Sequence, residues 1–338
     1  MRPFLIGQTD DMMEKEQWHP VALGESVTSA PLAGVLLEQP LVLWRDGQGR
    51  AQAWADQCPH RGARLSLGRV CEGKLECPYH GWQFDAAGQC VHVPALPQFV
   101  PPATHVVKTF ACTERNGLVW VRLAGSGDAA LPAFAAEDDA QLRKVNCGPY
   151  DVAASAPRII ENFLDMAHFG FVHEGWLGSR DVAQIADYAV ESTPTGLRAT
   201  GCKAVQPQSN LHSTAAAEVA YTYEVTAPYT AQLTKVPDAA SVAVQGYRES
   251  IGLFICPVTP EQSRVWFRLA VADFTSTDQV LRDFQHTIFT QDQPVLESQS
   301  PKRLPLDLRA EVHTAVDKAS SAYRRFLKQQ NITFGVIP

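Results

Sequence analysis

The sequence predicts an α+β protein, with a small antiparallel β domain followed by a second domain in which helices flank an antiparallel sheet. Short β-prone segments separated by turn residues extend to about residue 123. Helical periodicity follows, and further β-prone segments between residues 182 and 274 precede two more helical stretches. Such a grouping of strands and helices is typical of α+β proteins. We expect domains at 17–123 and 140–338, joined by an acidic, proline-containing connector at 124–139.

The composition excludes several classes of protein. The chain has 338 residues, 45% of them hydrophobic, which is enough for two cores of ordinary size. The net charge is -7 and the basic residues are scattered, so we expect neither a nucleic-acid nor a membrane partner. Since no apolar run suits a signal peptide or a spanning helix, we expect a cytoplasmic protein whose 8 cysteines stay reduced.

The first domain contains three segments with turn signals. Residues 34–54 are expected to form two strands joined at Asp46-Gly47, and residues 77–93 two more around a turn from Asp85 to Gly88. Residues 109–123 contain Asn116-Gly117, a strong hairpin signal. These turns predict antiparallel pairing throughout.

In the second domain, helices are expected at three places. Residues 156–169 have helical periodicity with Pro157 in the first turn, where proline is well tolerated. Two more helical stretches are expected at 277–299 and 308–329. Between the first and second of these helices, the segments split by Pro and Gly predict the sheet.

Two Cys-His pairs stand out in the first domain: Cys58 with His60, and Cys77 with His80. Zinc is one candidate, because two Cys and two His make a tetrahedral site, but zinc sites usually pair like residues at close spacing. One thiolate and one imidazole on each of two loops favours a two-iron cluster in which both thiolates bind one iron and both imidazoles the other.

A second set of candidate ligands lies in residues 161–176. Asn162, Asp165 and His168 are three apart, so they would share one face of the predicted helix, and His173 follows a turn at Gly170. Two histidines and one carboxylate form the facial triad of non-haem iron(II) oxygenases. In isolation, two satisfied core histidines remain the alternative.

The carboxylate of this triad is expected to be Asp292, on the predicted helix 277–299. An inward stripe is predicted at Leu281, Phe284, Ile288 and Val295, and Asp292 falls on it, whereas other acids of the helix do not. A carboxylate on a buried face is costly unless it is paired or bound to metal.

With both motifs placed, nearly the whole chain resembles the oxygenase component of a Rieske non-haem iron oxygenase. The Cys-x-His and Cys-x-x-His pairs match the Rieske signature, and residues 162–173 match the family's Asn-x-x-Asp-x-x-His-x4-His motif. Within the family, the chain is similar to saxitoxin-biosynthesis hydroxylases and methylxanthine N-demethylases. The resemblance implies a Rieske domain followed by a helix-grip catalytic domain. It also implies one [2Fe-2S] cluster and one mononuclear Fe(II) per subunit, with dioxygen as co-substrate.

The resemblance also implies partners and a reaction. Electrons would pass from NAD(P)H through a separate reductase or ferredoxin, and a small cyclic or aromatic substrate, with or without nitrogen in its ring, would be hydroxylated or oxidatively demethylated. A homotrimer would place His80 against Asp165 of the partner subunit, with Asp165 hydrogen-bonded to His168 and Asn162 near the iron.

Two other functions remain open from the sequence: a ring cis-dihydroxylating dioxygenase, and a Rieske electron-transfer protein. The sequence does not encode the substrate in any recognisable motif. Lining residues are expected between 182 and 274, and Phe163, Phe169, Leu177 and Phe254 are candidate apolar contacts.

Overall fold

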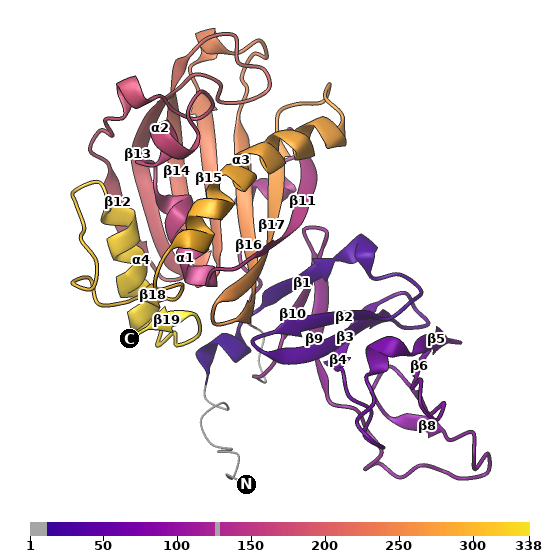
Figure 1. Cartoon of the computed structure of the whole chain (residues 1–338). Coiled ribbons are helices and arrows are strands. Elements are labelled where there is room, and N and C mark those ends of the chain that lie inside the picture. The colour runs from indigo at the N-terminus through magenta and orange to yellow at the C-terminus, as the bar shows by residue number, and fades with distance from the viewer. Residues whose placement is uncertain (1–11, 126–128) are drawn as a thin grey trace. The chain divides into compact units, whose positions relative to one another are not determined.

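The computed structural model describes residues 12–125 and 129–338. They form two compact units, Glu14–Ala130 and Leu131–Pro338, apart from the residues before Glu14 (Figure 1). Strands dominate both units and the helices fall mainly in the second, so the predicted α+β class is confirmed. None of the helices among the described residues is long and apolar enough to cross a membrane.

The first unit contains two antiparallel sheets. The larger has the strand order β1-β10-β9-β4-β3-β2 and the smaller β5-β6-β7-β8. The bounds are β1 His19–Leu23, β2 Leu32–Leu36, β3 Gln39–Arg45, β4 Ala51–Ala55, β5 Arg69–Cys71, β6 Lys74–Glu76, β7 Gln83–Phe84, β8 Cys90–His92, β9 Thr109–Arg115 and β10 Leu118–Arg122.

The hairpin predicted at Asn116-Gly117 is confirmed, because β9 and β10 flank these two residues and both have positive φ. The expectation of two strands in residues 34–54 is wrong, since the segment contributes to three, β2, β3 and β4. The missed turn is Leu37-Glu38, whose φ values of 50° and 62° give the doubly positive geometry of a type I′ hairpin without its usual residues. Leu37 is buried, so packing selects this turn.

The second unit is built on a seven-stranded antiparallel sheet with the order β11-β17-β16-β15-β14-β13-β12. The helices α1 to α4 lie on one face of it (Figure 1). The strand bounds are β11 Arg143–Val152, β12 Ala189–Thr193, β13 Gly196–Gln206, β14 Ala217–Ala227, β15 Thr230–Pro237, β16 Glu249–Thr259 and β17 Gln262–Val271, and a parallel pair joins β18 Leu304–Pro305 to β19 Val336–Ile337.

The helices are α1 Ala156–Leu164, α2 Phe169–Val172, α3 Asp278–Ser298 and α4 Lys318–Gln329. Ser155 caps α1 by accepting a hydrogen bond from the backbone N–H of Arg158, and Thr277 caps α3 in the same way. The last predicted helix begins ten residues later than expected. Asp317 accepts hydrogen bonds from the backbone N–H and the hydroxyl of Thr314, which favours turns in the segment before α4.

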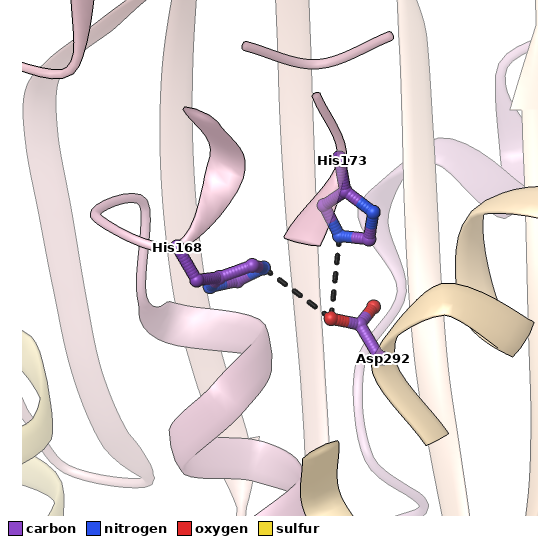
Figure 2. Close-up of side chains that lie close together, drawn as sticks. All are labelled: His168, His173 and Asp292. Atoms are coloured by element: carbon purple, nitrogen blue, oxygen red, sulfur yellow. Dashed lines mark ion pairs between the residues drawn. The ribbon is translucent and has the colours of Figure 1, made fainter. Parts of the chain in front are cut away.

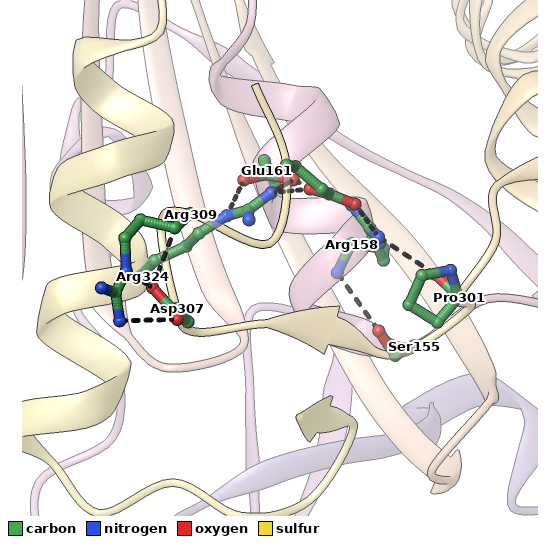
Figure 3. A network of polar contacts seen from close by, with 8 residues as sticks. Ser155, Arg158, Glu161, Pro301, Asp307, Arg309 and Arg324 are labelled. Carbon is green, nitrogen blue, oxygen red and sulfur yellow. Dashed lines mark hydrogen bonds and ion pairs between the residues drawn. The ribbon is translucent and has the colours of Figure 1, made fainter. Parts of the chain in front are cut away.

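A buried ion-pair network joins α1 to α4 (Figure 3). Both oxygens of Glu161 accept hydrogen bonds from Arg324, at 2.6 and 2.9 Å, and the Arg324 side chain is only 2% exposed. Arg324 and Arg158 also pair with Glu311, from the segment before α4. The network therefore ties the helix that carries Asn162 to the C-terminal helix.

Candidate metal centres and substrate cavity

The two Cys-His loops of the first unit have the same backbone shape. In each, the glycine after the histidine donates its N–H to the cysteine carbonyl: Gly62 to Cys58 at 2.9 Å, and Gly81 to Cys77 at 3.1 Å. Both glycines have φ near +70°, which disfavours other residues there. The two turns lie close together although sixteen residues of sequence separate His60 from Cys77.

The side chains of the two loops differ in burial by type. Cys58 and Cys77 are each 2% exposed and belong to the core of this unit, whereas His60 and His80 are exposed and their ring centroids lie 4.6 Å apart. Burial and the neighbouring Cys77 raise the pKa of the Cys58 thiol to about 12, although backbone N–H groups oppose the shift. A bound cation is therefore needed to hold the thiolate form, and the pattern fits a cluster with its imidazole end at the surface.

Aromatic packing extends from one of these imidazoles. The His60 ring stacks on Trp82 at 4.4 Å with an interplanar angle of 5°, and Trp82 stacks on His105 at 5.3 Å with the same angle. This packing restricts the rotamer of His60, which orients one candidate ligand before any metal binds.

In the second unit, His168, His173 and Asp292 meet (Figure 2). The Asp292 Oδ1 atom lies 3.4 Å from His168 Nε2 and 3.2 Å from His173 Nε2, and the three ligand atoms fall within 4.8 Å of one another. An ion about 2.1 Å from each ligand would hold adjacent ligand atoms about 3 Å apart, so these residues fit one metal ion.

The remaining ring nitrogens of both histidines have partners. His168 Nδ1 lies 3.1 Å from Asp165 Oδ2, and His173 Nδ1 lies 2.8 Å from Gln291 Oε1. A ligand histidine commonly donates its second N–H to an acceptor of this kind, which fixes the ring orientation and leaves Nε2 free for metal. Gln291 was not predicted, because a glutamine next to Asp292 carries no sequence signal that distinguishes it from a helix-surface amide.

We predicted that Asn162, Asp165 and His168 share one face of a helix. This prediction is wrong, because only Asn162 lies within α1. Helix α1 ends at Leu164, and Asp165 is extended, with φ −90° and ψ 132°. Its Oδ1 accepts a hydrogen bond from the backbone N–H of Ala167 at 2.7 Å, a local bond that competes with helix continuation. His168 therefore approaches the site from a turn between α1 and α2.

Asp292 lies on the buried face of α3, but the other residues of this face differ from the predicted inward stripe. The buried residues of α3 are Leu281, Gln285, Phe289, Asp292 and Leu296. Val295 is 44% exposed, so its inclusion was wrong. Asn162 on α1 donates to Asp292 Oδ1 at 3.2 Å, placing its amide beside the metal-binding atoms.

A mostly apolar cavity of about 100 Å³ opens on the triad. This is several times the space that one water requires, so it is a binding space rather than a packing defect. Phe163, Phe169 and Leu177 line it as expected, together with residues of β14 to β17 and α3. The expectation for Phe254 is wrong, because that ring packs edge-on against Phe134 and is absent from the described lining.

Both halves of the chain match known protein families. The model of the Rieske [2Fe-2S] domain matches residues 17–111, and that of the vanillate O-demethylase oxygenase C-terminal domain matches residues 152–330. These matches define an iron–sulfur oxidoreductase with a separate oxygenase domain.

Relatives that align with most of the chain support the same assignment. The chain is 34% identical to the methylxanthine N1-demethylase NdmA of Pseudomonas putida, over 94% of this chain and 85% of that protein. It is 30% identical to the N3-demethylase NdmB of the same organism, over 94% and 89%. The structure of NdmA with caffeine covers 94% of this chain and 90% of its own, with a TM-score of 0.82 at 32% identity.

The chain belongs to the Rieske non-haem iron oxygenases. As in the rest of the family, its cofactors are a [2Fe-2S] cluster and a mononuclear iron, it uses dioxygen, and it works as the oxygenase component of a multicomponent system. Electrons come from a reductase or ferredoxin partner, and the substrate is a small molecule. The predicted family, enzyme class and cofactors are thus confirmed.

Proposed function

We propose that this oxygenase removes a methyl group from a nitrogen or oxygen atom of a small ring compound. The observation that carries this proposal is the mostly apolar cavity that ends at His168, His173 and Asp292. The relatives NdmA and NdmB are methylxanthine N-demethylases, which supports a methyl group as the point of attack.

We assign the mononuclear iron to His168, His173 and Asp292, and the cluster to Cys58, His60, Cys77 and His80. When bound, these groups supply one-electron transfer and the activation of dioxygen. Asp165 and Gln291 orient the two imidazoles, and Asn162 holds Asp292 by donating to Oδ1. The apolar lining excludes water from the space beside these ligands.

The overall reaction balances with two electrons and two protons. One oxygen atom enters a C–H bond of the methyl group, and the other leaves as water. The hydroxymethyl product then breaks its bond to nitrogen or oxygen, releasing formaldehyde and the demethylated substrate. NAD(P)H supplies the electrons through the reductase.

We further propose a homotrimer, by likeness to the family, in which His80 of one subunit faces Asp165 of the partner subunit. The exposure of His60 and His80 supports this arrangement, since an edge open to solvent can receive a neighbouring subunit. We also propose that the protein is cytoplasmic, where a nicotinamide-linked reductase is available.

The test is reconstitution of the anaerobically purified protein with a Rieske-system reductase, NADH and caffeine or methoxybenzenes as probes. The proposal expects roughly three irons and two sulfides per chain, and about one formaldehyde per dioxygen consumed. A cis-diol carrying both oxygen atoms of one dioxygen would instead show a dihydroxylating dioxygenase. Two irons without any oxygen-dependent product after ferrous iron is added would show an electron carrier.

A further inference from the structure

One row of side chains across the sheet brings charge into the otherwise apolar cavity. Tyr221 on β14 pairs with Lys235 on β15, Lys235 with Glu249 on β16, and Glu249 with Val271 on β17. All four line the cavity. The row one step along the strands, Tyr223, Leu233, Ile251 and Leu269, faces the same cavity and is apolar except for the Tyr223 hydroxyl.

The charges in the first row cancel. The side chains of Lys235 and Glu249 are 5% and 8% exposed and form an ion pair. Tyr247 donates its hydroxyl hydrogen to the other Glu249 oxygen, Oε2, at 2.6 Å. Lys235 also donates to the Ser209 carbonyl. Both oxygens of the carboxylate are therefore held, and the row presents no net charge to a ligand.

Beside this row, away from the candidate metal ligands, an anionic ligand would find no unpaired lysine or arginine among the described residues. Among the described residues that line the cavity, Lys235 is the one lysine or arginine, and Glu249 already neutralises it. A carboxylate placed beside the pair would be buried without a counter-charge and would be repelled by Glu249. Burying an unpaired charge is far more costly than burying a neutral polar group.

A neutral ligand with a carbonyl group finds suitable donors instead. An ammonium group has three N–H donors, and two of those on Lys235 are used by Glu249 and Ser209. The hydroxyl of Tyr223 is buried and has no hydrogen-bond partner among the described residues. Both groups can donate to a carbonyl oxygen of a bound ring.

We propose that Glu249 selects against charge: by neutralising Lys235, it restricts the cavity to uncharged, carbonyl-bearing methylated rings and excludes carboxylates. This inference rests on the proposed function and specifies its substrate class. It also implies that removing the charge of Glu249 frees Lys235 to bind a carboxylate, reversing the preference.

The test uses two probes of similar shape, neutral 2-methoxybenzamide and anionic 2-methoxybenzoate, with calorimetric binding to the full-length protein at pH 6.5. Burial lowers the pKa of Lys235 to about 7. In the Glu249→Gln variant the lost carboxylate lowers this pKa further, and a bound 2-methoxybenzoate restores the counter-charge that favours the ammonium form. The variant is Glu249→Gln, which keeps an acceptor for Tyr247, and the control is Lys235→Met/Glu249→Gln, which lacks both charges.

The wild type is expected to bind the amide at least tenfold more tightly than the carboxylate. Glu249→Gln should bind 2-methoxybenzoate at least tenfold more tightly than the wild type does, and the double variant should lose that gain. Equal binding of the two probes by the wild type, or no gain of carboxylate binding in a folded Glu249→Gln protein, would overturn the proposal. If Glu249→Gln does not fold, the proposal is tested by whether the wild type binds the amide more tightly than the carboxylate.

Formaldehyde release with the same probes separates this inference from the proposed function. Charge selection in binding, with no formaldehyde from these probes or from caffeine, would leave the inference standing and refute the demethylase. Formaldehyde from both probes at equal efficiency would support the demethylase and refute the inference of charge selection.

Discussion

Each of the two imidazoles that face Asp292 is oriented through its other ring nitrogen. Asp165 holds His168, and Gln291 holds His173. These hydrogen bonds stabilise the tautomer in which Nδ1 carries the proton and Nε2 is unprotonated, which is the form that binds a metal ion. The orienting residues therefore affect metal affinity without touching the metal.

The substitution Gln291→Leu is expected to weaken iron binding by about 10-fold to 100-fold, because the His173 ring loses its acceptor while the side-chain size is kept. Competition with a chelator gives the dissociation constant. Gln279→Leu is the matched control, since Gln279 is exposed on the same helix and bonds only Asp283 among the described residues. Equal iron affinity in the two variants would refute the orienting role.

The substitution Asp165→Asn is expected to keep both metals but to abolish coupled turnover. Asparagine is nearly isosteric, and its one oxygen can accept a hydrogen bond from His168 if the bond from the Ala167 N–H is given up. It lacks the charge and the second acceptor oxygen needed for a bridge to His80 of the partner subunit. Metal analysis, single-turnover reoxidation of the cluster and product formation are the measurements. Asp181→Asn is the control, at an exposed position. A fully active Asp165→Asn enzyme would exclude the bridge.

At the scale of elements, α1 and α3 hold the site from opposite sides. Helix α1 supplies Asn162 and leads into the turn that carries His168, and α3 supplies Gln291 and Asp292. Helix α1 is anchored by the Glu161 and Arg324 pair, so its position depends on a buried charge network as well as on apolar packing (Figure 3).

The substitution Glu161→Gln is expected to destabilise the protein by about 2 to 4 kcal/mol, because among the described residues it leaves the buried Arg324 with Glu311 alone as a counter-charge. Chemical denaturation of the full chain measures the loss. Glu174→Gln provides the comparison, since the Glu174 and Arg180 side chains are 49% and 59% exposed and such pairs contribute under about 1 kcal/mol. Similar losses in both variants would show that the network is not stabilising.

At the scale of the whole molecule, the proposed trimer predicts that two inactive variants can restore activity when they assemble together. His80→Ala should lose the cluster, and Asp292→Ala should lose the mononuclear iron, so each variant alone is expected to be inactive. If electrons pass between subunits, trimers formed by co-expressing both variants should recover part of the wild-type activity, because some interfaces pair an intact cluster with an intact iron site.

The readout is product formed per chain after separate affinity tags have isolated the mixed oligomers. Separately purified variants, combined without subunit exchange, serve as the control and should remain inactive. Mixed oligomers as inactive as this control would favour electron transfer within one chain, and a monomeric wild-type protein in solution would contradict the trimer directly.

Local sequence patterns determined much of this protein. The Cys-x-His and Cys-x-x-His loops, the hairpin at Asn116-Gly117 and the start of α1 beside Pro157 depend on a few neighbouring residues, which made them predictable from the sequence. The buried position of Asp292 on α3 could be predicted because it follows from the 3.6-residue period of a helix.

Only the tertiary structure decided the rest. The end of α1 at Leu164 depends on the local bond of Asp165, and the acceptor role of Gln291 depends on the approach of α2 to α3. The pairing of Lys235 with Glu249 depends on the register of β15 with β16, fourteen residues apart in sequence. Contacts between distant segments leave no periodic pattern in the sequence of either segment, so they could not be predicted. The sequence by itself determined the chemistry of the two metal centres. Tertiary packing decided the selectivity that we infer for the cavity.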